Sequence, residues 1–124
     1  MSKALRVSDY LEHILASIER IERHTSNVDK LGFLSSELVQ DAVVRNIEII
    51  GEAANNILRV DAAFAAANDG IPWQVMYAMR NRVSHGYEKV DFEMVWKTIR
   101  NDLPALYRQV RACSIGRNRP SDPV

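Results

Sequence analysis

Apolar residues recur at three- and four-residue spacing along most of this chain, and that amphipathic-helix periodicity limits the possible folds more than any other feature. The first periodic stretch contains Leu11, Ile14, Leu15, Ile18 and Ile21. Ser8 or Asp9 is suited to cap its start, and we expect it to end near His24. Nowhere do apolar and polar residues alternate as they would in a half-buried strand. The sequence therefore predicts an all-α protein.

A second predicted helix, which Ser35 or Ser36 can cap, is apolar over most of its circumference. Its apolar residues are Val39, Ala42, Val43, Ile47, Ile49, Ile50, Ala53, Ala54 and Ile57. The remaining polar stripe is narrow and consists of Asp41, Arg45, Glu48, Glu52 and Asn55. A helix with so wide an apolar surface is expected to lie centrally and to pack against more than one neighbour. The stripe is expected to face solvent, with the alternative that part of it lines a cleft.

The rest of the chain predicts two more helices and a tail. A short helical turn from Ala62 to Ala67 precedes Pro72, which suits the start of a third helix that Gly86 would stop. A fourth helix is predicted from about Asp91, with a bend at Pro104. The expected fold is a four- to five-helix up-and-down bundle, one domain over residues 1–112. Residues 113–124, rich in Gly, Pro, Ser and Arg, are expected to form a disordered tail.

Charge and cysteine content narrow the classes of function. The 16 Lys and Arg residues balance the 16 Asp and Glu residues, so no global charge attracts this chain to nucleic acid or to an anionic membrane. The single cysteine, Cys113, excludes an intrachain disulfide and a cysteine-rich zinc site. The first residues lack the apolar stretch of a signal peptide or a membrane span. We expect a cytoplasmic protein with no membrane contact, whose RNA contacts, if any, are local.

Arg80 is a charged residue on the apolar face of the third predicted helix. At about 100° of rotation per residue, its stripe also contains Trp73, Met76 and Val83. A guanidinium in such a place needs a carboxylate, a phosphate or a partner subunit, because burying it unpaired is costly. The structural alternative is an ion pair with Glu48 or Glu52.

His85 follows Arg80 by five positions, and Tyr87 follows two positions later. Five positions correspond to about 500° of rotation, so the Arg80 and His85 side chains would diverge by about 140° in a continuous helix. They converge only if His85 lies at the fraying helix end or faces a second chain. The spacing therefore favours a composite site built by two chains.

The residue types at this site suit cleavage of RNA by a ribose 2′-hydroxyl that attacks the adjacent phosphate. A histidine such as His85 transfers protons near neutral pH, and an arginine such as Arg80 neutralises charge that develops on phosphorus-bound oxygens. Neither a metal nor another cofactor is needed, and DNA would be spared because deoxyribose lacks the hydroxyl. Asn81 is a candidate to orient the phosphate and Arg82 a candidate to hold the strand.

The segment Arg80-Asn81-x-x-x-His85-x-Tyr87 resembles the Arg-x4-His-x-Tyr signature of the HEPN domain family, in particular of its HepT toxin branch. The segments over residues 41–54 and 95–104 resemble the second and fourth helices of that branch. The resemblance runs from about Val7 to Val110, with its three blocks in the order of the family.

The resemblance implies a metal-independent endoribonuclease toxin that forms a homodimer through its motif-bearing helices. In such dimers the arginine and histidine of both chains meet in one cleft, which makes Arg80 and His85 the implied catalytic residues. The implied partner is a minimal nucleotidyltransferase antitoxin, which transfers AMP from ATP to the motif tyrosine. Tyr87 matches that acceptor, and its structural alternative is a ring packed under the helix end.

The neutral charge balance is unusual for a protein that holds RNA, because contacts to phosphates normally come from Lys and Arg. Two copies of Arg80 and Arg82, joined by Arg45, would form a basic cleft in a dimer, and Lys89 is a further contributor. The main alternative is a non-catalytic HEPN module that binds a nucleotide or docks a nucleotidyltransferase. A plain dimeric scaffold is a third possibility, although it leaves Arg80 and the His-x-Tyr sequence without a role.

Overall fold

The computed structural model describes residues 6–84 and 90–117, and every regular element within these two ranges is helical. The helices are α1 (Val7–Thr25), α2 (Lys30–Leu34), α3 (Glu37–Val60), α4 (Ala62–Ala67), α5 (Trp73–Ser84), α6 (Phe92–Lys97) and α7 (Leu103–Arg117), and a π-helical turn, η1 (Thr98–Asp102), joins α6 to α7. None of the described helices is long and apolar enough to cross a membrane. The prediction of an all-α bundle is confirmed.

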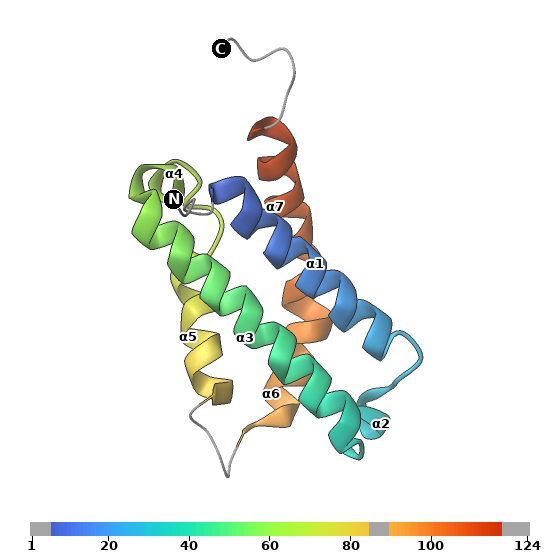
Figure 1. Cartoon of the computed structure of the whole chain (residues 1–124). Helices are drawn as coiled ribbons and strands as arrows, with labels where there is room; N and C mark the ends of the chain where they lie inside the picture. Colours follow the sequence, from blue (N-terminus) through green and yellow to red (C-terminus); the bar gives the residue numbers. More distant parts are fainter. Residues whose placement is uncertain (1–5, 85–89, 118–124) are drawn as a thin grey trace, which may run out of the picture.

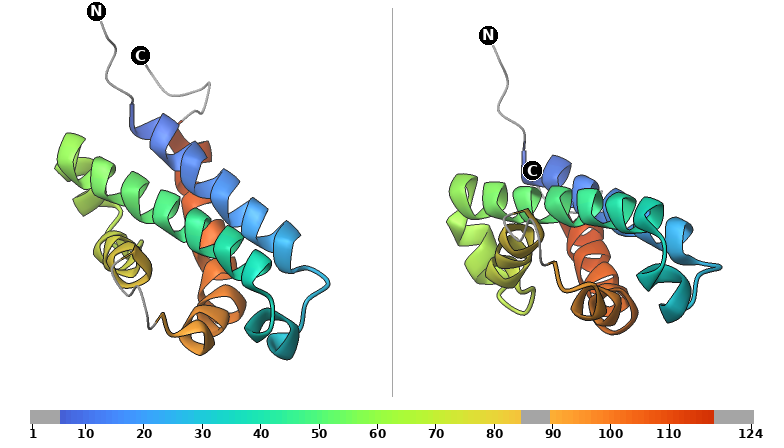
Figure 2. Two further views of the ribbon diagram at one scale, coloured as in Figure 1. Left: turned by 60° about the horizontal axis from the view of Figure 1, so that its bottom comes forward. Right: turned by 90° about the horizontal axis from the view of Figure 1, so that it is seen from below.

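The long helices form two layers. Helices α1 and α3 lie side by side and antiparallel in one layer, and α5 and the α6–α7 segment cover one face of that pair (Figures 1 and 2). Helix α3 packs against both α1 and α5, and α7 packs against α1. The predicted central position of the second long helix is therefore confirmed. Buried side chains from all four long segments form one apolar core.

The start of α3 was predicted correctly, and the start of α1 differs in detail. Ser36 caps α3, and its hydroxyl accepts a hydrogen bond from the backbone N–H of Val39 at 3.2 Å. Helix α1 begins at Val7, and the Asp9 carboxylate accepts from the backbone N–H of Arg6 at 2.9 Å. Asp9 thus stabilises the first turn from inside the helix, as the acidic residue of a capping box does.

Helix α2 lies between the first two predicted helices, where the sequence predicted no helix. Asp29 caps it, with a carboxylate that accepts from the Gly32 backbone N–H at 2.8 Å. Phe33 is completely buried and stacks on Trp96, with 5.3 Å between the ring centroids. A single turn and a half of helix is too short to show a period in the sequence, so tertiary packing of Phe33 decides this structure.

The fourth predicted helix changes its hydrogen-bond pattern before Pro104. Residues Thr98–Asp102 form a π-helical turn, and α7 begins at Leu103. Proline lacks a backbone donor and its ring crowds the carbonyl four residues earlier, so a wider turn at this position relieves both problems. A wider helical turn thus precedes Pro104, and the bend of the helix at Pro104 stays a prediction.

The tail boundary predicted at residue 113 is wrong in part. Helix α7 continues to Arg117, and Ser114 is buried because the helix still packs against its neighbours there. Cys113, at the start of the predicted tail, is partly buried on the same helix. Residues 118–124 lie outside the described residues.

A polar contact joins the first and last helices. The hydroxyl of Tyr107 in α7 donates to the Glu19 carboxylate of α1 at 2.6 Å. This hydrogen bond raises the pKa of Tyr107, because the carboxylate holds the hydroxyl proton. The bond contributes to stability below the ordinary pKa of tyrosine and is lost as the pH rises through the raised pKa.

Candidate functional site

Arg80 lies in the last turns of α5, against α3. Its Nε donates to the Glu52 carboxylate at 2.9 Å, and its Nη1 donates to the Asn81 side-chain oxygen at 3.0 Å. The guanidinium also lies over the Tyr77 ring, 5.7 Å from its centroid. Glu52 is therefore the partner in the ion pair that the sequence offered as an alternative. A pair this exposed contributes little stability, and its main effect is to orient the guanidinium.

The side chain of Arg80 is only partly removed from solvent. It is 30% exposed, and that of Glu52 is 52% exposed. A guanidinium that is oriented and still accessible can exchange one carboxylate contact for a phosphate contact without first being unburied. The structural ion pair and a role in phosphate binding are thus compatible.

Gly51 permits the close approach of α5 to α3 that puts Arg80 beside Glu52. A Cβ atom at position 51 would overlap the Cβ of Arg80 and would lie 2.9 Å from the carbonyl oxygen of Met76. Sequence reasoning about the site did not single out this residue. The available signal was a glycine in the middle of a strongly apolar helix, which often marks close packing of two backbones.

A polar cleft adjoins Arg80 and lies between α1, α3 and α5. Its lining residues are Tyr10, His13, Arg45, Glu48, Ile49, Glu52, Ala53, Asn56 and Arg80, and its volume is about 490 Å³. We call it the Arg80 cleft. Three residues of the polar stripe of α3, namely Arg45, Glu48 and Glu52, line it. The alternative that part of the stripe lines a cleft is therefore correct.

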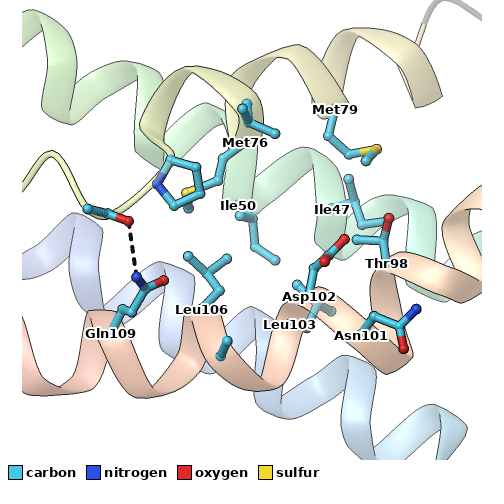
Figure 3. Close-up of a pocket in the computed structure, with 14 residues that line it drawn as sticks. Ile47, Ile50, Met76, Met79, Thr98, Asn101, Asp102, Leu103, Leu106 and Gln109 are labelled. Atoms are coloured by element: carbon cyan, nitrogen blue, oxygen red, sulfur yellow. Dashed lines mark hydrogen bonds between the residues drawn. The ribbon is translucent and has the colours of Figure 1, made fainter.

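A second hollow, of about 400 Å³, lies between α5 and the η1–α7 segment, with α3 at its floor. Figure 3 shows Met76 and Met79 of α5 on one side and Leu103 and Leu106 of α7 on the other. Among the described residues, its lining contains no Lys, Arg or His side chain, and Asp102 gives it a negative charge. The Arg80 cleft, which two arginines line, is the better candidate for a nucleic-acid site.

The remaining predicted site residues divide into two groups. Asn81 is partly buried, and its side-chain oxygen faces Arg80, so it orients the guanidinium; Arg82 is exposed. His85 and Tyr87 lie outside the described residues, as does Lys89. The structure thus brings Arg80 and Asn81 together, and the convergence of Arg80 with His85 stays a prediction.

Two comparisons with known proteins bear on this site. A family model described as "Ribonuclease HepT-like" matches residues 14–113, which include the rest of α1 from Ile14, the residues of α3 and α5 that line the Arg80 cleft, and the whole Arg-x4-His-x-Tyr segment. No solved structure matches the chain.

Curated relatives carry related names. A protein of Thermococcus cleftensis named "Probable ribonuclease HepT" is 42% identical over 98 residues, which cover 79% of this chain and 86% of the relative. A protein of Methanocaldococcus jannaschii named "Gamma-glutamylcyclotransferase and putative RNase" is 38% identical over 104 residues, 84% of this chain and 46% of its own length. A Caldanaerobacter subterraneus protein named "Putative RNase" is 32% identical over 102 residues, 82% of this chain and 88% of the relative.

Proposed function

Because this chain belongs to the HepT-like ribonuclease family, we propose that it cleaves RNA at a site that contains Arg80 and His85. The observation that carries the proposal is the setting of Arg80. Glu52 and Asn81 orient its guanidinium at the edge of a polar cleft, and the side chain keeps 30% of its surface exposed. That is the arrangement needed to receive a phosphate group whose charge increases during reaction.

In the proposed reaction, one His85 side chain removes the proton from a ribose 2′-hydroxyl, and the oxygen attacks the adjacent phosphorus. The bond from phosphorus to the 5′ oxygen breaks, and that oxygen takes up a proton from a second, protonated histidine. The products are a 2′,3′-cyclic phosphate and a 5′-hydroxyl. Arg80 stabilises the phosphorane because its guanidinium donates two parallel hydrogen bonds to phosphate oxygens.

The proposed active unit is a homodimer. Two His85 side chains supply the base and the acid, and a single helix would direct Arg80 and His85 apart by about 140°. Two copies of Arg80 and Arg82 also concentrate positive charge that the neutral chain otherwise lacks. The substrate is therefore bound by local charge in the shared cleft.

A substrate comparison tests the proposed chemistry. We expect the purified protein to cut a single-stranded RNA oligonucleotide in the presence of a metal chelator and to leave the DNA of the same sequence intact, because only RNA has the attacking hydroxyl. Replacing one ribose by deoxyribose should block cleavage at that position alone. The products are identified by mass spectrometry. Cleavage of the DNA, or cleavage that starts only when a divalent metal is added, would contradict the proposal.

We further propose that this ribonuclease is the toxin of a toxin–antitoxin pair and that a nucleotidyltransferase silences it at Tyr87. The Tyr87 hydroxyl would attack the α-phosphorus of ATP, form a new oxygen–phosphorus bond and release pyrophosphate, while its proton passes to a base of the transferase. The attached AMP adds bulk and negative charge two positions from His85. Like-charge repulsion then opposes the approach of an RNA phosphate.

Co-expression with the partner nucleotidyltransferase tests the modification. Wild-type protein should carry AMP on Tyr87, as seen by peptide mass spectrometry, and cells should grow. The Tyr87→Phe variant should stay unmodified and remain toxic, because phenylalanine has no hydroxyl to accept the nucleotide. Tyr107→Phe, which removes a hydroxyl far along the chain, serves as the matched control and should be silenced like the wild type. Full silencing of Tyr87→Phe would refute the proposed switch.

A further inference from the structure

Two aromatic side chains of α1, Tyr10 and His13, line the Arg80 cleft, although neither belongs to the motif. Their rings meet edge to face, with 6.1 Å between centroids and 82° between the ring planes. Tyr10 is partly buried and packs against the core, and His13 is exposed. The first ring is therefore held in place by the fold, and the second stands where a ligand can reach it.

We propose that this part of the Arg80 cleft binds the RNA nucleotide next to the cleaved phosphate, with its base on Tyr10 and His13 and its phosphate on Arg45. The inference rests on the proposed function, since it assumes that Arg80 acts on RNA. It adds a binding subsite on α1 and α3, outside the segment from Arg80 to Tyr87.

The size of the cleft fits this occupant. Its volume of about 490 Å³ lies within the range of roughly 300 to 1,000 Å³ that is typical of sites for small organic ligands. One nucleotide is a ligand of this class, whereas an RNA duplex is too wide to enter. The cleft therefore suits a single strand whose bases are unstacked and free to contact side chains.

The mixture of side chains also fits a nucleotide better than a simple anion. Arg45 is exposed on α3 and lines the same cleft as Arg80, so the two cations can contact successive phosphates of a strand. Glu48 and Glu52 line the cleft as well, and they would weaken the binding of an isolated phosphate. Carboxylates accept hydrogen bonds from the amino groups of bases, and aromatic rings stack on bases of any sequence.

Binding measurements on the full-length chain test the inference. The His85→Ala background prevents cleavage, and a fluorescein-labelled single-stranded RNA oligonucleotide reports binding by anisotropy. We expect His13→Ala to weaken binding about threefold to tenfold and Tyr10→Leu about tenfold, in line with the loss of one base–aromatic contact. Tyr10→Phe keeps the ring and should bind like the parent protein.

The chain offers a matched control for each variant. His24 is a second exposed histidine of α1 outside the cleft, and Arg23 is an exposed arginine of the same helix. His24→Ala and Arg23→Ala should leave RNA binding unchanged. Arg45→Ala should weaken binding and lower by about one the slope of log affinity against log salt concentration, because one phosphate contact is lost.

The outcomes separate this inference from the proposed function. If the wild type cuts RNA and both His13→Ala and Tyr10→Leu bind RNA as the parent does, the subsite is refuted while the nuclease proposal stands. If the wild type does not cut RNA at all, both proposals fail. A free mononucleotide carries the same base and phosphate groups and is therefore the competing ligand. Should AMP displace the oligonucleotide at matched concentration, the cleft is a mononucleotide site and the inference is overturned.

Discussion

Arg80→Ala and His85→Ala proteins, each inactive alone, are expected to recover part of the RNA cleavage when the two chains are combined in one dimer. Each substitution removes a group that acts in the transition state, so each alone should lower the cleavage rate by a factor of about 10² to 10⁴. A mixed dimer still has one intact Arg80, from the His85→Ala chain, and one intact His85, from the Arg80→Ala chain. If the active site is built from both chains, these two residues meet in the same cleft. Water must then replace the missing second histidine as the proton donor, so the recovery of cleavage is expected to be partial.

The measurement is cleavage of a labelled RNA by co-expressed, differently tagged variants purified through both tags. Random pairing makes about half of all dimers mixed, so purification through both tags is needed to isolate them. The control is a doubly substituted chain, Arg80→Ala with His85→Ala, paired with either single variant. Such a dimer has no intact Arg80 or no intact His85, so it cannot build a site that contains both. A mixed dimer as inactive as the double variant would show that each chain builds its own site.

The sequence of one chain could not by itself show which side chain pairs with Arg80. The helical wheel placed Arg80 on an apolar stripe and directed His85 away from it, and the structure supplies the missing partner for Arg80 in Glu52 of α3. The sequence offered that ion pair as one of two alternatives, because side chains 28 positions apart meet only after the helices have packed. The contact to Asn81 is local, yet its direction toward Arg80 also depends on the packed geometry.

The fold was predictable where a period extends over several turns. Helices α1, α3, α5 and the α6–α7 segment each present a long apolar face, and Ser36 and Asp91 cap helices where sequence reasoning placed starts. The prediction failed for α2, whose structure depends on the burial of Phe33 against Trp96. It also ended the last helix too early, because Ser114 is buried by contacts that a Gly- and Pro-rich composition does not reveal.

The Arg80 cleft was likewise predictable only in part, because one of its walls follows from the sequence of α3 and the others depend on how the helices pack. The polar stripe of α3 was visible in the sequence, and whether it faced solvent or a cleft depended on the side chains that α1 and α5 bring to it. His13 and Tyr10 are ordinary residues of an amphipathic helix until the fold places them beside Arg80. No pattern within α1 distinguishes them from residues that are merely exposed or half-buried.

Gly51→Ala is expected to destabilise the protein and to impair cleavage, although helix propensity alone predicts the opposite. In the interior of a helix, alanine is more favourable than glycine by about 0.5 to 1 kcal/mol. At position 51 the added methyl group would overlap the Cβ of Arg80 and crowd the carbonyl oxygen of Met76, 2.9 Å away. The backbone of α5 cannot give way as a flexible side chain would, so the two helices must separate.

Separation of α3 from α5 should cost about 1 to 3 kcal/mol of unfolding free energy, the range found for overpacked cores. It also moves Arg80 relative to Glu52, and a shift of about 1 Å at a reacting centre can lower a rate by a factor of about 10². Urea unfolding and RNA cleavage measure the two effects separately. Gly70→Ala is the matched control, because a Cβ at Gly70 meets nothing within 4 Å.

The sign of the Gly51→Ala effect decides which force governs this position. A more stable variant would show that propensity outweighs packing and that α3 and α5 adjust freely, which would remove the geometric basis for placing Arg80 beside Glu52. A less stable variant with reduced cleavage would tie the position of Arg80 to the close contact of the two helices. If cleavage falls at temperatures where the variant is still fully folded, the loss comes from the displacement of Arg80 and not from unfolding.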